Sequence, residues 1–93
     1  MPELHFFIEW PDGTTETCYS PSTVVRTHFT GGTSYPMADF LARSRAALTA
    51  ASERVRAIHG APCCLALAQL ARIEAAGSRY PAGSNVVFKS FRE

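Results

Sequence analysis

The chain has 93 residues, of which 46% are hydrophobic and 18% are charged, with a formal net charge of +1. A chain of this length forms one hydrophobic core rather than two, and this composition is too apolar for a disordered segment. We therefore expect residues 1–93 to form a single folded domain.

The N-terminal 20 residues predict a β-hairpin. Residues 4–10 are rich in strand-forming side chains, and Pro11-Asp12-Gly13 then supplies a turn whose glycine can take a positive φ. With Gly13 as the left-handed residue of a three-residue loop, Phe6 lies opposite Cys18 and His5 lies opposite Tyr19. This register puts one group of residues on the core side, Leu4, Phe6, Ile8, Trp10 and Cys18, and a second group on the outer side, His5, Phe7, Glu9, Thr15, Thr17 and Tyr19.

Three helices are expected in the middle of the chain. Ser20-Pro21-Ser22-Thr23 reads as an N-cap followed by proline in the first turn, which predicts a short helix that ends before Gly31-Gly32. Tyr35-Pro36 opens a longer helix, which Gly60 ends, and its buried stripe is predicted to be Met37, Phe40, Leu41, Ala47, Leu48, Ala51, Val55 and Ile58. Pro62 opens the third helix, which Gly77 caps, with a buried face of Cys63, Ala66, Leu67, Leu70 and Ile73.

A last strand is predicted over residues 85–91. The fold class expected from this order is α+β, with a three-stranded sheet made of the N-terminal hairpin and the C-terminal strand, and two to three helices packed on one face. The last strand joins the first one, and its direction stays open. A helix over 36–59 is about 35 Å long, whereas a seven-residue strand is about 23 Å long, so one end of that helix should overhang the sheet.

An apolar cluster is expected on the sheet face away from the helices. Its members are Phe7, Tyr19, Val87 and Phe91. Small monomers rarely leave such a cluster exposed, so it predicts an interface with a partner, most simply a second copy of the chain. The alternative is that residues 30–35 or 77–84 fold over this face.

Catalytic side chains are sparse. Cys63 in the first turn of the third helix, with His59 four residues earlier, is the one candidate for nucleophilic or redox chemistry, because a helix N-terminus stabilises a thiolate. A buried structural thiol is the alternative. The histidines and cysteines lack the spacing of a metal site, so we expect no metal and no cofactor.

Four arginines of the long helix resemble a basic surface until they are placed on a helical wheel. Arg43 and Arg54 then fall on one side of the buried stripe, and Arg45 and Arg56 fall on the other. Such arginines usually pair with acids such as Asp39 or Glu53, so a nucleic-acid-binding regulator is only an alternative reading.

The expected location is the cytoplasm. The longest uncharged run, from Ala57 to Ala71, is shorter than the roughly 18–20 residues of a membrane-spanning helix. The start of the chain lacks a basic segment followed by an apolar one, so no export signal is predicted. Three cysteines in a reducing compartment are expected to stay thiols.

Several short sequence motifs, in a fixed order, resemble those of one protein family. They cover nearly the whole chain, to about Ala75: Trp10-Pro11-Asp12-Gly13, Cys18-Tyr19-Ser20-Pro21-Ser22, Val24-Val25, Tyr35-Pro36 with Phe40, Ser44-Arg45-x-Ala47-Leu48, Ala51-Ser52-Glu53-Arg54-Val55-Arg56, and Cys63 with Ala66-Leu67-Ala68-Gln69-Leu70. This set is similar to the small bacterial nitrogen-starvation-response proteins that accompany a nitrilase in a conserved gene cluster.

The resemblance implies a role in adaptation to nitrogen limitation, with protein partners encoded in the same cluster. It supplies no catalytic residues. We therefore expect a non-enzymatic accessory protein that acts through protein–protein interaction, as a homo-oligomer, with a Cys63-dependent thiol enzyme or carrier as one alternative and a nucleic-acid-binding regulator as another.

Overall fold

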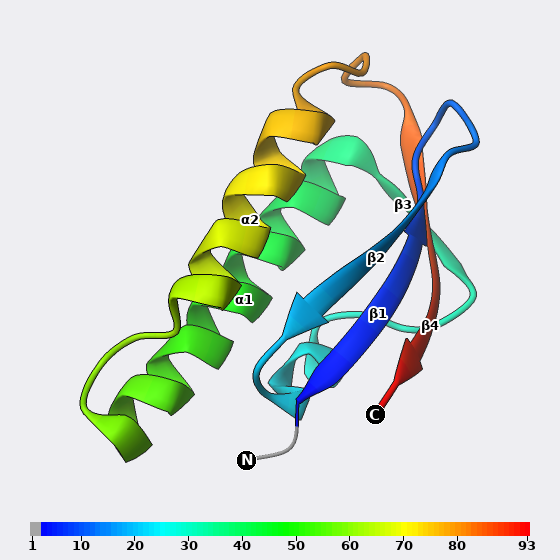
Figure 1. The fold of residues 1–93 in the computed structure, drawn as a ribbon. Coiled ribbons are helices and arrows are strands. Elements are labelled where there is room, and N and C mark those ends of the chain that lie inside the picture. Colours follow the sequence, from blue (N-terminus) through cyan, green and yellow to red (C-terminus); the bar gives the residue numbers. More distant parts are fainter. Residues whose placement is uncertain (1–2) are drawn as a thin grey trace.

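A computed structural model describes residues 3–93 and places the helices on one face of an antiparallel sheet (Figure 1). The sheet has four strands in the order β2-β1-β4-β3, rather than the three strands expected. The elements in chain order are β1 (Leu4–Glu9), β2 (Thr15–Ser20), the 3-10 helix η1 (Thr23–Thr27), β3 (Thr33–Pro36), α1 (Met37–His59), α2 (Cys64–Gly77) and β4 (Asn85–Arg92).

The N-terminal hairpin has the predicted register. Phe6 faces Cys18 and His5 faces Tyr19 across the β1–β2 pair. Gly13 has a φ of 89°, and the Trp10 N–H donates to the Thr14 carbonyl at 2.8 Å, which closes the loop. The predicted core side of this hairpin is buried, so strand alternation and the turn were sufficient to define it.

The short helix after the hairpin differs from the prediction. It is a five-residue 3-10 helix, and its N-cap is Ser22 rather than Ser20, with the Ser22 hydroxyl accepting from the Val24 N–H. The Ser20 hydroxyl is buried and instead donates to the Ser22 carbonyl at 2.7 Å. Proline therefore lies before the cap, not in the first turn, and the segment is too short for more than a tight 3-10 turn.

Strand β3 was missed in the sequence, where its residues were read as loop and helix start. It pairs antiparallel with β4, with Tyr35 opposite Val86. Only four residues long and ending in a proline, it has the composition of an edge strand, whose pairing depends on a strand 50 residues later. β4 joins β1 as predicted, and its direction is antiparallel.

Glycine ends α1 but does not cap α2: Gly77, the predicted cap, is the last residue of that helix, and Ser78 is its C-cap. Gly60 follows α1 in the left-handed conformation, with φ 83°, and its N–H donates to the Arg56 carbonyl. α1 runs past the sheet toward the α1–α2 turn (Figure 1), as its length predicted. Ile58, expected in the buried stripe, is therefore 62% exposed, because nothing in the described chain covers that end of the helix.

The buried face of α2 is shifted relative to the prediction. Leu67 is 42% exposed, whereas Gln69 is only 7% exposed. Cys63 lies before the first turn, as the N-cap residue, and is half-buried. The shift arises because Gln69 satisfies a backbone group of the sheet, which the apolar pattern of a single helix cannot reveal.

Aromatic rings fill the space between the sheet and the helices. Phe6, Phe29 and Phe88 stack with nearly parallel rings, at centroid distances of 4.5 Å between Phe29 and Phe88 and 5.4 Å between Phe6 and Phe88. Trp10 adds an edge contact with Phe40 at 5.8 Å. Within residues 3–93, neither helix has the length and apolar character needed to cross a membrane.

Candidate functional site

The sheet face opposite the helices carries three of the four predicted interface residues. Phe7, Tyr19 and Val87 point to this outer face, because each alternates with a buried neighbour on its strand, and all three are half-buried. Phe7 lies on β1, an inner strand that has β2 on one side and β4 on the other. The outer face therefore has an apolar centre that no helix covers (Figure 1).

Phe91 does not belong to this cluster. The pairing of β1 with β4 shifts between Phe7, which faces Ser90, and Ile8, which faces Phe88, so that Lys89 is an extra, unpaired residue. This β-bulge changes the alternation, and Phe91 lies opposite Phe6 on the core side. There its ring packs against Phe88 at 4.9 Å. The two consecutive polar residues Lys89-Ser90 were the signal of a bulge in the sequence.

Polar side chains surround the apolar centre of the outer face. The Arg92 guanidinium lies 5.4 Å from the centre of the Phe7 ring, and His5 makes an edge contact with Tyr19 at 5.7 Å. The Lys89 ammonium pairs with Glu9 at 3.3 Å. These long side chains shield part of each ring, so the outer cluster is smaller and more polar at its rim than the sequence predicted.

Tyr19 is the most polar member of the cluster. Burial raises the pKa of its phenol, and Cys63 and Glu3 close by raise it further. The phenol therefore stays protonated near neutral pH and remains a hydrogen-bond donor at the rim of the face.

Cys63 and His59 lie on either side of the α1–α2 turn. The Cys63 N–H donates to the Ser52 hydroxyl at 3.1 Å, which ties the start of α2 to α1. His59 is exposed in the last turn of α1. In the described part of the chain no hydrogen bond joins the thiol to the imidazole, so the thiol-chemistry hypothesis has a helix N-terminus but no base in contact with the sulfur.

The other cysteines offer no stronger site. Cys18 is buried under β2, and this burial raises the pKa of its thiol far above the ordinary value, so it stays protonated. Cys64 is exposed. Nowhere in residues 3–93 do three His, Cys, Asp or Glu side chains gather closely enough to hold a metal ion.

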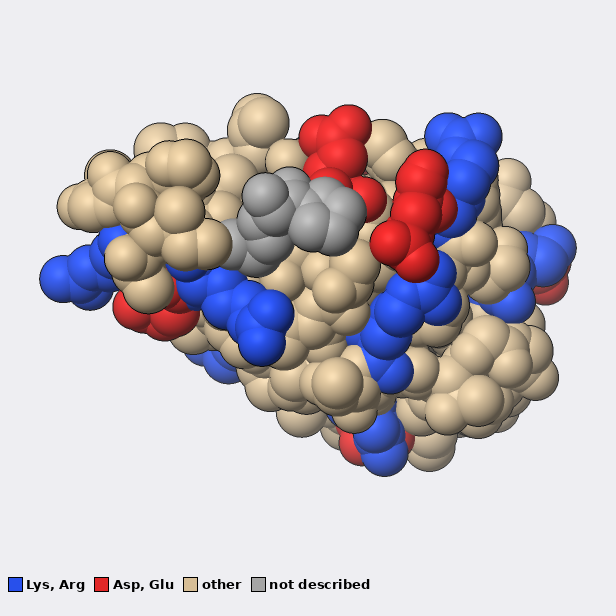
Figure 2. Space-filling model, turned by 90° about the horizontal axis from the view of Figure 1, so that it is seen from below, with Lys and Arg blue, Asp and Glu red and all other residues tan. Residues whose placement is uncertain are grey.

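Three of the four helix arginines pair with acids, as their positions predicted. Arg43 bonds Asp39 at 2.9 Å, Arg56 approaches Glu53 at 3.8 Å, and Arg45 bonds Glu74 on the neighbouring helix. Figure 2 shows Lys and Arg side chains interspersed with Asp and Glu over the face seen from below. This face carries no continuous basic surface of the kind that binds nucleic acid.

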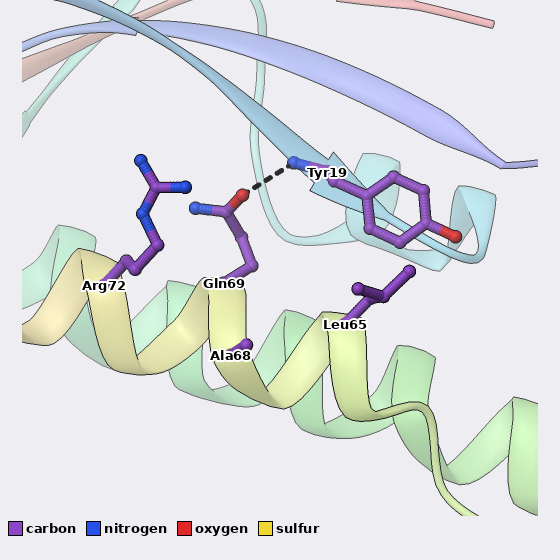
Figure 3. A pocket seen from close by; sticks show the side chains of 5 residues that line it. All are labelled: Tyr19, Leu65, Ala68, Gln69 and Arg72. Atoms are coloured by element: carbon purple, nitrogen blue, oxygen red, sulfur yellow. Dashed lines mark hydrogen bonds between the residues drawn. The ribbon is translucent and has the colours of Figure 1, made fainter.

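A groove that the sequence did not suggest runs between β2 and α2. One part is a hollow of about 220 Å³ lined by Tyr19, Leu65, Ala68, Gln69 and Arg72 (Figure 3). The adjoining part, of about 270 Å³, is lined by Glu16, Arg72, Ala75, Ala76 and Arg79. Gln69, on the floor of this groove, is the functional candidate that sequence reasoning missed, because its burial depends on a strand 50 residues away.

These features define a class of protein: a small α+β chain in which a helical hairpin backs one face of an antiparallel sheet and leaves the other face open. The particular family follows from comparison. Residues 5–91 match the family model described as nitrogen starvation-induced protein NitG, and the chain belongs to this family. No curated protein and no solved structure gave a significant match. The resemblance to nitrogen-starvation-response proteins is thus confirmed over nearly the whole chain.

Proposed function

We propose that this nitrogen-starvation-induced protein is a non-enzymatic accessory protein that binds another protein through the outer face of its sheet. The observation that carries the proposal is the position of Phe7, Tyr19 and Val87 on the face that the helices leave open. An apolar centre with a polar rim is the usual anatomy of a protein–protein interface. The cytoplasm is the proposed location.

Phe7 is the proposed anchor of this interface. It lies on an inner strand, with Tyr19 on β2 and Val87 on β4 diagonally across from it, since they pair with His5 and Glu9. Aromatic side chains contribute most of the energy of many interfaces. In the simplest arrangement the partner is a second copy of the chain, with the two faces packed around a two-fold axis. The other proposed partners are proteins encoded with it in the nitrilase gene cluster.

The test for self-association is size-exclusion chromatography with light scattering, at tens of micromolar. We expect a dimer for the wild type and a monomer for Phe7→Glu, because a buried carboxylate facing its own copy is strongly unfavourable. Ile58→Glu is the matched control: Ile58 is 62% exposed near the end of α1, so the same substitution there should leave the dimer intact.

The test for an accessory role is co-purification of cluster enzymes with the tagged protein from nitrogen-starved cells. The wild type should retain a partner that Phe7→Glu loses and Ile58→Glu keeps. A monomeric wild type rules out the second copy as partner. If Phe7→Glu also leaves co-purification unchanged, the outer face is not the interface.

A further inference from the structure

Strand β2 leaves one edge of the sheet unpaired. It pairs with β1 on one side only, and the Tyr19 N–H points away from β1 because it donates to the Gln69 Oε1 at 3.0 Å. Backbone groups alternate in direction along an antiparallel strand, so Thr15 and Thr17 present their N–H and C=O groups to the same side. No strand of residues 3–93 pairs with this edge, which is therefore available to an added strand.

Helix α2 turns this open edge into the wall of a groove. The two hollows between β2 and α2 share Arg72, so they adjoin each other and together form a channel interrupted by this side chain. The helix side of the channel includes the small residues Ala68, Ala75 and Ala76, which leave room for a neighbouring chain between the longer side chains. An extended peptide that pairs with the edge of a sheet beside a helix is a recurrent mode of recognition.

The Gln69 side chain occupies the last outward-facing N–H of the β2 edge, that of Tyr19, and places a donor without a partner beside this edge. Its side chain is 7% exposed, and while the Oε1 accepts from Tyr19, the buried Nε2 has no hydrogen-bond partner. Buried donors without partners are rare in folded proteins. In Figure 3 the Nε2 is turned along the groove toward Arg72. A ligand carboxylate that draws the exposed Arg72 side chain toward itself would also provide an acceptor for this amide.

The charge of the groove favours an acidic ligand. Arg72 is 72% exposed and approaches Glu16 only at 3.6 Å, while Glu16 also accepts from the Trp10 indole at 2.9 Å. Arg79 is exposed farther along the groove, and no described carboxylate lies within pairing distance of it. Two guanidinium groups thus face one side chain of opposite charge.

We infer that this groove binds an acidic, extended segment of a partner protein, which adds to β2 as a fifth strand. The segment pairs with the backbone of Thr15 and Thr17, and its carboxylates bind Arg72 and Arg79. The Gln69 amide donates to the carboxylate nearest Tyr19. This site lies at the edge of the sheet; it shares Tyr19 with the outer face proposed above as the main interface, but neither Phe7 nor Val87 lines it.

A second copy of the chain fits this edge poorly. A two-fold pairing that uses the free backbone groups of both Thr15 and Thr17 and keeps the bond between Gln69 and Tyr19 places Thr15 opposite Thr17 of the copy. Glu16 then lies directly opposite Glu16 of the copy, and like charges in that position destabilise a pair of strands. The alternative register uses the Tyr19 N–H to pair the two strands, and it therefore breaks the hydrogen bond from this N–H to Gln69.

The spacing of the two arginines favours internal acidic residues over a C-terminal carboxylate. Arg72 and Arg79 are separated by seven residues of helix, or about 10.5 Å along its axis. Side chains on one face of a strand recur about every 6.6 Å, so acidic residues two or four positions apart come within reach of both long arginine side chains. A single terminal carboxylate cannot reach both.

The test is a titration of the full chain with a blocked peptide, acetyl-Val-Glu-Val-Glu-Val-Thr-amide, followed by the amide signals in a two-dimensional NMR spectrum. We expect saturable shifts at the Thr15 and Thr17 amides and at the side-chain NH2 of Gln69. The same peptide with Gln in place of Glu should bind about tenfold more weakly or worse, since it loses charge-assisted bonds. Equal binding of the two peptides, or no shift up to millimolar peptide, overturns the inference.

Variants of the groove separate this site from the outer face. Gln69→Glu keeps an acceptor for the Tyr19 N–H but repels a carboxylate, and Thr17→Pro removes an N–H that the folded sheet does not use. Each variant should bind the acidic peptide about tenfold more weakly than the wild type, or worse. Arg54→Gln, which removes a positive charge from α1, and Phe7→Glu on the outer face should both leave peptide binding unchanged. Loss of binding in Phe7→Glu but not in Gln69→Glu would assign the peptide to the outer face.

Discussion

The two faces of the sheet differ although they are made of the same strands. Phe6, Ile8 and Phe88 on the helix side are 0–1% exposed, whereas Phe7 and Val87, each next to one of them in sequence, are half-buried. Because successive side chains of a strand point to opposite faces, neighbouring residues lie in different environments. The helix side stabilises the fold, and the outer side is the surface proposed to contact a partner.

The largest expected difference between the faces is in stability. Phe88→Ala removes the central ring of the aromatic stack and should lower the free energy of unfolding by about 3–5 kcal/mol. Phe7→Ala removes a ring of the same size from the outer face and should cost about 1 kcal/mol. Urea denaturation of both variants measures the two values. Equal losses would contradict the assignment of the outer face to recognition.

The second expected effect tests the bulge in β4. Phe91→Ala should lower the free energy of unfolding by about 1.5–2 kcal/mol, because the ring packs against Phe88 and the guanidinium of Arg26, at 4.7 Å, lies over it. It should cost more than Phe7→Ala under the same conditions. The opposite ranking would return Phe91 to the outer face, where uninterrupted alternation puts it.

The third effect is a pH dependence on the helix side. Burial raises the pKa of Cys18 above its ordinary value of 9.0, so above pH 9 the unfolded chain releases this proton while the folded chain retains it. Stability from this group is therefore fully present below pH 9 and falls as the pH rises, by about 1.4 kcal/mol per pH unit. Denaturation from pH 8 to 10 should show a flatter profile for Cys18→Ala than for the wild type. Parallel profiles would mean that the thiol ionises in the fold.

The smallest expected effect concerns an exposed ion pair remote from both faces. Asp39→Asn breaks the bond to Arg43 one turn along α1, and both side chains are more than two-fifths exposed. The free energy of unfolding should fall by only about 0.3–0.5 kcal/mol, and less at high salt, because solvent and ions screen such a pair. A loss as large as that of Phe91→Ala would show that this pair is coupled to the core.

Much of the fold was readable in local patterns. The hairpin register followed from Pro11-Asp12-Gly13 and alternation, and the end of α1 followed from Gly60. The exposed end of α1 was implied by its length, although the sequence could not show that this leaves Ile58 exposed. For the candidate interface, alternation sufficed at Phe7 and Tyr19, which lie on strands with regular pairing, and it failed at Phe91 beyond an irregular pair.

The sequence by itself determined the hairpin, the two α-helices and the difference between the sheet faces, because these depend on side-chain periods and turn residues within a few positions of each other. Only the tertiary structure decided the fourth strand, the side of Phe91 and the burial of Gln69. Each of these depends on a backbone group from a distant part of the chain. Strand β3 forms by pairing with β4, the bulge arises where β4 pairs with β1, and Gln69 is buried where it accepts from the Tyr19 N–H. Hydrogen bonds between distant segments have no periodic signature in either segment alone.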